Sequence, residues 1–193
     1  MSLYEIYFSP TGGTKKAADI IAKGIGAPVT RVDMIKQVKA LKELAFEKDD
    51  LCVIAVPSYG GRVPTPAAVD LKRLKGNGAK AVLTVVFGNR AIDDTLTELQ
   101  DVLTEDGFIC LAGIEAVAEH SLMHQFAAGR PDKKDEKVLT GFAKEIKEKC
   151  ISCMHCVAVC PKHARHYSKL LSVVAAQKMK KNCSDRKENK LYI

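Results

Sequence analysis

Residues 4–14, Tyr4-Glu5-Ile6-Tyr7-Phe8-Ser9-Pro10-Thr11-Gly12-Gly13-Thr14, form the stretch that decides the fold class. The first five of these residues are apolar enough for a β-strand, and the remainder form a glycine-containing turn. Beyond the turn, Ala17, Ala18, Ile21 and Ile25 repeat at helical spacing. A strand that passes through a glycine turn into a helix is typical of the first unit of an α/β domain.

Four more apolar segments of strand length follow, at residues 29–32, 51–56, 81–87 and 108–117. Amphipathic stretches separate them, and one expected helix begins at Thr65-Pro66, with proline in its first turn. Nearly continuous apolar strands are typical of a parallel sheet that is covered on both faces. We therefore predict an α/β fold, a doubly wound five-stranded parallel sheet over residues 1–147, with a small extension over residues 148–193.

The extension begins with the cysteine motif C-x2-C-x2-C-x3-C-P, formed by Cys150, Cys153, Cys156, Cys160 and Pro161. Bacterial ferredoxins hold a cubane iron–sulfur cluster with this spacing. Structural zinc sites usually carry two separated Cys/His pairs, so the evenly stepped motif favours iron and sulfide over zinc. We therefore predict that these cysteines bind a 4Fe-4S cluster.

The fourth ligand of this cluster has two candidates. In two-cluster ferredoxins the last cysteine of such a motif serves the other cluster, and this chain has no second motif. Either Cys160 closes the local site, or Cys183 arrives from an expected helix over residues 167–181, on whose apolar side it falls. The sequence leaves both open.

The composition is that of a globular protein of 193 residues, with 47% hydrophobic and 27% charged residues. No apolar run approaches the roughly 20 residues that a membrane span needs. The first residues lack the charged-then-apolar layout of a signal peptide. We therefore expect a cytoplasmic protein without a membrane contact, whose thiols stay reduced and whose C-terminal cysteine motif binds metal.

The formal net charge of +7 is concentrated in residues 161–193, which hold nine Lys/Arg against two Asp/Glu. A basic tail can contact nucleic acid or an acidic partner, or can be a solvated helix face. No aromatic RNA-binding pattern or groove-reading motif accompanies it, so a nucleic-acid partner is not expected.

Three polar loops follow the first, third and fourth expected strands: residues 9–14, 57–64 and 88–93. The carboxyl ends of parallel strands meet at one edge of a sheet, where ligands of doubly wound folds bind. The first loop opens a helix, so its backbone N–H groups and the helix dipole favour an anion such as a phosphate. His120 and His124 lie near a further loop, over residues 121–132, and are expected to be structural.

These loops resemble those of the flavodoxin family, through residues 9–14, Ser58-Tyr59-Gly60 and Gly88-Asn89-Arg90. With the cysteine motif, the chain is similar to flavodoxin-type proteins fused to a ferredoxin-type 4Fe-4S extension. The resemblance spans nearly the whole chain, including residues 128–132 and 186–189. It implies a flavodoxin-like fold and FMN as the bound ligand.

The resemblance also assigns the FMN contacts by position. Residues 9–14 would bind the phosphate, residues 57–61 would line the ring, and residues 88–93 would cover its other side. The residues so assigned are Ser9, Thr11, Gly12, Gly13, Thr14, Pro57, Ser58, Tyr59, Gly60, Gly61, Gly88, Asn89, Arg90 and Asp93. Ile92 stands where such proteins often carry an aromatic residue, which weakens the expectation of ring stacking from the third loop.

We therefore expect an electron-transfer protein that relays electrons between FMN, a 4Fe-4S cluster and redox partner proteins. Such a relay requires the two groups to come close to one another, directly or through a partner or a second copy. The alternative is an enzyme, a flavin-dependent reductase of a quinone, a nitro compound or a metal ion. The chain lacks the dinucleotide fingerprint, which argues against direct use of NAD(P)H. The sequence makes no prediction of the oligomeric state.

Overall fold

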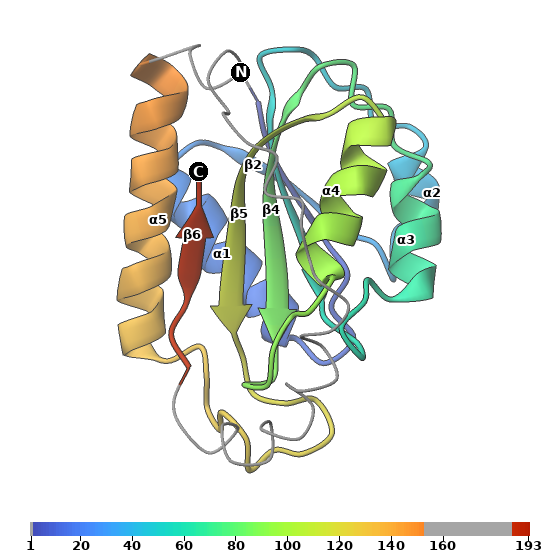
Figure 1. The fold of residues 1–193 in the computed structure, drawn as a ribbon. Helices are drawn as coiled ribbons and strands as arrows, with labels where there is room; N and C mark the ends of the chain where they lie inside the picture. The colour runs from blue at the N-terminus through green and yellow to red at the C-terminus, as the bar shows by residue number, and fades with distance from the viewer. Residues whose placement is uncertain (1, 153–186) are drawn as a thin grey trace, which may run out of the picture.

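The computed structural model describes residues 2–152 and 187–193, shown in Figure 1. The strands are β1 (Leu3–Tyr7), β2 (Val29–Asp33), β3 (Leu51–Pro57), β4 (Lys80–Phe87), β5 (Ile109–Val117) and β6 (Lys190–Tyr192). The helices are α1 (Gly13–Ile25), α2 (Val38–Leu41), α3 (Thr65–Leu71), α4 (Thr95–Glu105) and α5 (Lys133–Ser152). The expected helix over residues 167–181 lies outside the described residues.

The sheet has the strand order β2-β1-β3-β4-β5-β6, and β1 to β5 are all parallel. This confirms the doubly wound parallel sheet. The structure adds β6, which pairs antiparallel with β5 at the sheet edge, with Leu191 opposite Ile114. Residues 190–192 belong to the stretch that the sequence analysis assigned to the C-terminal extension, and their pairing with β5 makes them part of the sheet.

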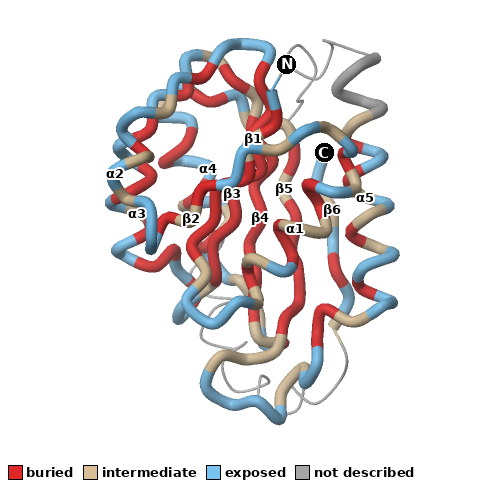
Figure 2. Tube along the Cα trace, turned by 180° about the vertical axis from the view of Figure 1, so that it is seen from behind, coloured by how far each residue is buried: buried red, intermediate tan, exposed pale blue. Residues whose placement is uncertain are grey.

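Helices cover both faces of the sheet, so the apolar strands form two cores. Side chains from α3 and α4, such as Leu71 and Leu99, pack on one face. Side chains from α1 and α5, such as Ile21 and Leu139, pack on the other. Figure 2 shows buried residues along the central strands and exposed residues on the outer sides of the helices.

The loops after β1, β3, β4 and β5 all lie at the carboxyl edge of the sheet (Figure 1). Helix α5 begins at this edge and runs back along the sheet, so its last turn lies at the opposite edge. Lys187 contacts Asn89 and Arg130 at this carboxyl edge, and β6 begins three residues later, at Lys190. Ser152 and Lys187 thus lie at opposite edges of the domain.

Candidate functional site

A cavity of about 420 Å³ opens at the carboxyl edge of the sheet, where four loops meet. Its volume falls within the range of small-molecule and cofactor sites, roughly 300–1,000 Å³. Its lining residues are Pro10, Thr11, Gly13, Thr14, Pro57, Ser58, Tyr59, Gly60, Val86, Phe87, Gly88, Ala118, Glu119, His120, Ser121 and Leu122.

The loop after β1 presents unpaired backbone donors to this cavity. Lys15 N–H donates to Ser9 Oγ at 2.9 Å, and Lys16 N–H donates to Gly12 O at 2.9 Å. The N–H groups of Gly13 and Thr14 have no hydrogen-bond partner among the described residues. They lie at the positive end of the α1 dipole, which suits an anion.

Gly12 leaves space in front of these donors. Its φ of 91° is in the left-handed region, and a Cβ added to it would meet nothing within 4 Å. Glycine is thus the residue that adopts this turn without strain and without filling the space before the helix. Of the predicted residues in this loop, Thr11, Gly13 and Thr14 line the cavity, whereas Ser9 Oγ accepts the hydrogen bond from Lys15 N–H in the first turn of α1.

The loop after β3 places an aromatic ring at the cavity. Tyr59 and Arg62 exchange two backbone hydrogen bonds of 3.0 and 3.2 Å around Gly60 and Gly61, both with positive φ. Tyr59 as a whole residue remains 43% exposed, and its partial burial raises the pKa of its hydroxyl. A Cβ on Gly60 would meet nothing within 4 Å, so the loop is open toward a flat ligand.

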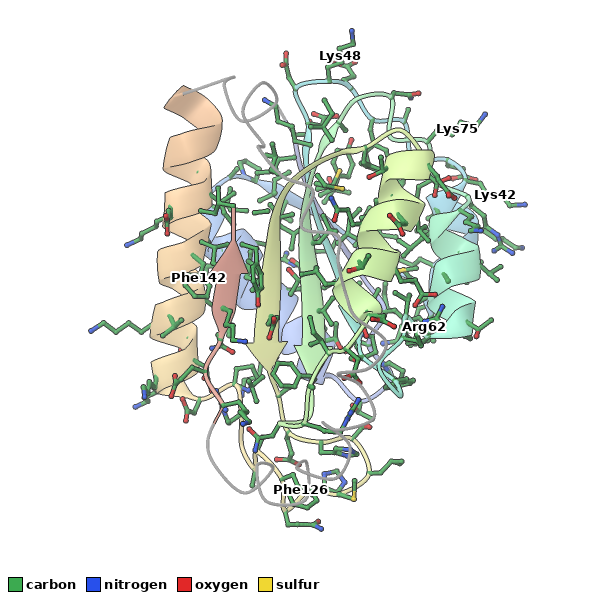
Figure 3. All side chains as sticks on the ribbon, in the orientation of Figure 1. Lys42, Lys48, Arg62, Lys75, Phe126 and Phe142 are labelled. Atoms are coloured by element: carbon green, nitrogen blue, oxygen red, sulfur yellow. The ribbon has the colours of Figure 1, made fainter. Side chains whose placement is uncertain are left out.

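Contacts with α4 hold the Tyr59 loop in place. Arg62 donates two hydrogen bonds to the Glu98 carboxylate, at 2.9 and 3.0 Å, and Val63 N–H donates a third at 2.9 Å. The Arg62 hydrogen bond is the main cause that lowers the pKa of Glu98. Arg62 lies beside the first turn of α4 (Figure 3). Ser58 Oγ also lies 2.8 Å from Thr95 Oγ1.

The loop after β4 contributes less to the cavity than the sequence predicts. Only Gly88 lines it. Asn89 is buried, and its Oδ1 accepts a hydrogen bond from Lys187 N–H at 3.1 Å. Arg90 and Asp93 pair with each other, and Gly61 packs against Asp93. Asn89, Arg90 and Asp93 therefore support the loops, and neither they nor Gly61 are among the lining residues.

The loop after β5 supplies the wall that the sequence analysis missed. Ala118, Glu119, His120, Ser121 and Leu122 all line the cavity. The only sequence signal is their position directly after an apolar strand, at the same edge as the other three loops.

Glu119 closes the β5 loop upon itself. Its carboxylate accepts a hydrogen bond from Gly129 N–H at 2.7 Å and lies 2.7 Å from His124 Nδ1. The hydrogen bond from Gly129, followed by that from His124, lowers the pKa of Glu119. The loop, which carries Phe126 at its outer end (Figure 3), is thus held at its base.

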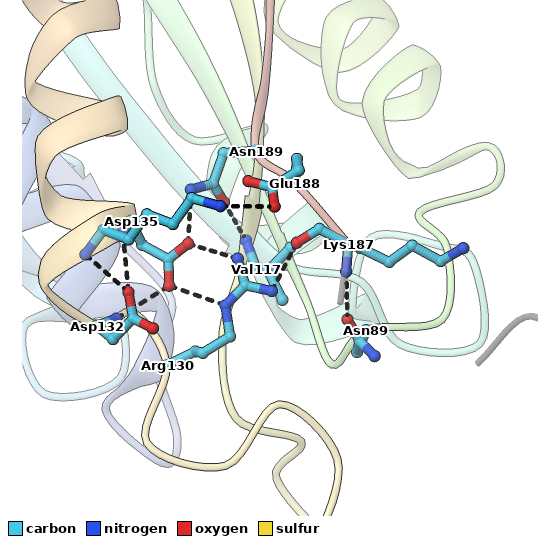
Figure 4. Close-up of polar contacts among 9 residues, drawn as sticks. Asn89, Val117, Arg130, Asp132, Asp135, Lys187, Glu188 and Asn189 are labelled. Atoms are coloured by element: carbon cyan, nitrogen blue, oxygen red, sulfur yellow. Dashed lines mark hydrogen bonds and ion pairs between the residues drawn. The ribbon is translucent and has the colours of Figure 1, made fainter. Parts of the chain in front are cut away.

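A buried ion pair ties the C-terminal residues to this edge of the domain (Figure 4). Arg130 donates to both oxygens of Asp135, and Asn189 Nδ2 donates to Asp135 Oδ1 at 3.1 Å. Arg130 also donates to Lys187 O at 2.7 Å, and Asn189 Oδ1 accepts from Val117 N–H at 2.8 Å. Residues 187–189 are therefore fixed beside the first turn of α5 and the Asn89 loop.

The same network determines the ionisation of Asp135. Burial favours the neutral acid, but the hydrogen bonds from Arg130 and from Asp132 N–H outweigh burial and lower the pKa of Asp135. The side chains of Arg130 and Asp135 are 4% and 1% exposed. Because both side chains are buried, the charge of each is stabilised mainly by the opposite charge of the other.

Comparisons with solved structures find the same architecture in flavoproteins. A flavodoxin from Streptococcus pneumonia TIGR4 is 23% identical, with a TM-score of 0.52, and the match covers 77% of this chain and 99% of the other. A flavodoxin from the domain Archaea is 16% identical, with a TM-score of 0.55, covering 77% and 98%. An NADH:FMN oxidoreductase in its apo form is 17% identical, with a TM-score of 0.58, covering 77% and 89%.

Residues 143–166 match the family model of the 4Fe-4S binding domain. The chain has a flavodoxin-like fold with a 4Fe-4S binding extension. No protein of curated function matches its sequence.

The family match contains four cysteines of the extension, Cys150, Cys153, Cys156 and Cys160, and ends before Cys183. Cys150 belongs to the last turn of α5, and the other predicted ligands lie outside the described residues. Within the described part of the flavodoxin-like domain, no group of three His, Cys, Asp or Glu side chains could hold a metal ion. Nor does any helix within that part have the length and apolar character to cross a membrane.

Proposed function

We propose that this protein binds FMN in the cavity at the carboxyl edge of the sheet and transfers electrons to and from redox partner proteins. The observation that carries the proposal is the pair of unpaired N–H groups, on Gly13 and Thr14, at the start of α1. They face a cavity that also has a flat aromatic wall. A ligand with a phosphate at one end and a planar ring at the other fits both features.

The residues around the cavity suit the parts of FMN. Thr11, Gly13 and Thr14 would hold the phosphate through backbone N–H groups and hydroxyls, in the space that Gly12 leaves open. Tyr59 would contact the ring. Bound FMN would supply the capacity to accept and release one or two electrons, and the chain's contribution is binding and electrostatics.

Flavin titration tests the phosphate site. We expect the chain to bind FMN at one per chain, measured by quenching of flavin fluorescence, and to bind riboflavin at least 10-fold more weakly because riboflavin lacks the phosphate. Gly12→Ala should weaken FMN binding, since the added methyl group enters the open space before the helix. Equal affinity for FMN and riboflavin would contradict the proposed phosphate site.

Gly26→Ala is the matched control for Gly12→Ala. Gly26 lies at the other end of α1 with a φ of 70°, and a Cβ there would meet only atoms at 3.8 Å or beyond. Both variants therefore place alanine at a positive φ, which strains the backbone in each case. Only Gly12→Ala should change FMN affinity, whereas both should lower the stability of the domain.

For the cluster, we propose that Cys160 is the fourth ligand. Residues 187–189 contact Arg130 and Asp135, at the start of α5. From Asp135 to Cys150 the helix rises about 22 Å, and the four residues from Cys183 to Lys187 span at most about 14 Å. Cys183 could therefore approach Cys150 only with this segment fully stretched, whereas Cys160 follows within the same family match.

This arrangement bears on how electrons pass between the two groups. The first cluster ligand lies at the far end of α5 from the cavity. Electron tunnelling slows steeply with distance, so we propose that flavin and cluster exchange electrons between molecules, through a second copy or a partner. The proposed electron relay between FMN and the cluster then includes one intermolecular step.

Kinetics at several protein concentrations test this step. After photoreduction of the flavin under anaerobic conditions, reduction of the cluster is followed by its visible absorbance. We expect the observed rate constant to fall about 10-fold when the protein is diluted 10-fold. A rate constant that does not depend on concentration would contradict exchange between separate molecules.

The small-molecule reductase is the other candidate. Steady oxidation of NAD(P)H with a quinone or nitro compound by the purified chain, without added redox proteins, would favour it over the carrier. We expect no such turnover above the rate of free FMN.

A further inference from the structure

His120 lines the cavity from the loop after β5, and its environment is more specific than that of a surface histidine. Its Nδ1 accepts hydrogen bonds from two backbone N–H groups, Leu122 at 3.2 Å and Met123 at 3.1 Å. An imidazole nitrogen that accepts hydrogen bonds carries no proton, so the proton of the neutral ring is on Nε2. The loop therefore selects one tautomer.

Packing fixes the position of this ring as well. A Cβ on Gly88 would lie 2.6–2.8 Å from Cδ2, Cβ and Cγ of His120, so only glycine allows the ring to pack against the end of β4. The Phe126 ring contacts the imidazole edge-on, with ring centroids 6.4 Å apart. The backbone carbonyl of Phe126 also accepts a hydrogen bond from the backbone N–H of His120 at 3.1 Å. The ring is thus held from three directions.

The remaining nitrogen is a donor without a recipient. Among the described residues, no group accepts a hydrogen bond from His120 Nε2. The carboxylate of Glu119, the neighbouring residue in the cavity wall, is already hydrogen-bonded to Gly129 and His124. The Nε2–H group of His120 is therefore a side-chain donor that is fixed in position and available to a ligand in the cavity. A rigid donor at a ligand cavity selects a ligand with an acceptor atom at that position.

We propose that His120 donates a hydrogen bond from Nε2 to the pyrimidine edge of the flavin and thereby raises its reduction potential. The inference rests on the proposed FMN function. Reduction of the flavin by two electrons, taken from a partner or from dithionite in the assay, with uptake of one proton leaves a negative charge on the pyrimidine edge. A hydrogen bond to a charged acceptor is stronger than one to a neutral acceptor, so this donor stabilises the reduced flavin more than the oxidised flavin.

Two variants separate this role from a structural one. His120→Asn keeps an acceptor for the loop N–H groups near the position of Nδ1, but it removes the donor at the position of Nε2. His120→Gln places an amide N–H near the position of Nε2. The measurement is the two-electron midpoint potential of the full chain with FMN bound, after fluorescence titration has established that each variant binds FMN.

We expect His120→Asn to lose about 10-fold of the preference for reduced over oxidised flavin, which lowers the potential by about 30 mV. His120→Gln should recover most of this loss. If His120→Asn keeps the wild-type potential with FMN bound, the proposal is wrong and His120 only shapes the loop. If the wild-type chain binds no FMN, the proposed function itself fails, which the titration shows before any potential is measured.

A second measurement needs no variant to bind flavin. In the full chain labelled with ¹⁵N-histidine, the ring of His120 should show the Nε2–H tautomer, and its Nε2 resonance should shift when FMN is added. The resonance is assigned by its loss in either variant. An Nδ1–H tautomer, or an Nε2 resonance that FMN does not move, would overturn the proposal.

Discussion

Asp135→Asn provides the most demanding test of how the C-terminal residues are held. Asp135 is 1% exposed and accepts hydrogen bonds from Arg130, from Asp132 N–H at 2.9 Å and from Asn189 Nδ2 at 3.1 Å. An asparagine keeps the shape but removes the charge, and its amide group faces donors. Arg130 is then a buried charge without a counterion, which costs about 3–5 kcal/mol.

The assay is urea unfolding at pH 7, followed by far-ultraviolet circular dichroism because the chain has no tryptophan. In thermal unfolding, a domain of this size loses about 2–4 °C per kcal/mol, so Asp135→Asn should melt about 6–20 °C lower. Adding Arg130→Met to this variant should cost less than the sum of the two single changes, since the unpaired charge is then removed.

Glu188→Gln is the control for this experiment. Glu188 pairs with Lys134 at 3.2 Å, but the two side chains are 53% and 63% exposed. Exposed pairs of this kind contribute at most about 1 kcal/mol, so this variant should unfold close to the wild type. A loss of less than about 1 kcal/mol in Asp135→Asn would refute the reasoning that the Arg130–Asp135 pair holds residues 187–189 in place.

Three further outcomes are expected. Tyr59→Ala should weaken FMN binding about 2- to 10-fold through the lost ring contact, whereas Tyr59→Phe should not; equal loss in both would assign the effect to the hydroxyl. Burial, reinforced by the charge of Asp19, raises the pKa of Glu5 to about 7 from its ordinary 4.5. The protonated Glu5 side chain therefore contributes to the stability of the fold below pH 4.5, and this contribution is lost as pH rises through 7. Urea unfolding should therefore show Glu5→Gln gaining stability relative to the wild type between pH 5 and 8, and a constant difference would contradict this. Cys153→Ser should abolish the cluster, and Cys160→Ser should lose iron whereas Cys183→Ser retains it, as measured by iron and sulfide assays.

Local pattern was enough to predict the sheet. Strand β3 is buried throughout and β4 is buried at every residue after Lys80, so their sequences are apolar at nearly every position and differ clearly from those of the helices between them. The cysteine motif was equally clear, because its spacing is dictated by the geometry of the cluster. Parts of the cavity followed from the rule that parallel strands end at one edge.

Features that depend on tertiary contacts could not be predicted in this way. Strand β6 is only three residues long, and it follows Asn189, whose side chain is hydrogen-bonded to Asp135 and to Val117 N–H. The tautomer of His120 depends on two backbone N–H groups within its own loop. Neither the strand β6 nor the tautomer of His120 leaves a periodic pattern in the sequence. The four-residue helix α2 (Val38–Leu41) is likewise too short for a helical pattern to reveal.

The β5 loop is a different case, since the edge rule applies to it as well. Ala118 follows β5 directly, in the same way that Ser58 follows β3 and Gly88 follows β4. Its residues line the cavity, whereas Asn89, Arg90 and Asp93 of the predicted loop do not. The resemblance to flavodoxins assigns ligand contacts to the other three loops only.

The central claim, that one chain carries both a flavin and a cluster, is tested most directly by composition. Protein purified under anaerobic conditions should contain one FMN and four iron atoms with four sulfides per chain, with an absorbance spectrum that shows both groups. Zinc in place of iron, or no flavin bound after incubation with excess FMN, would contradict the account.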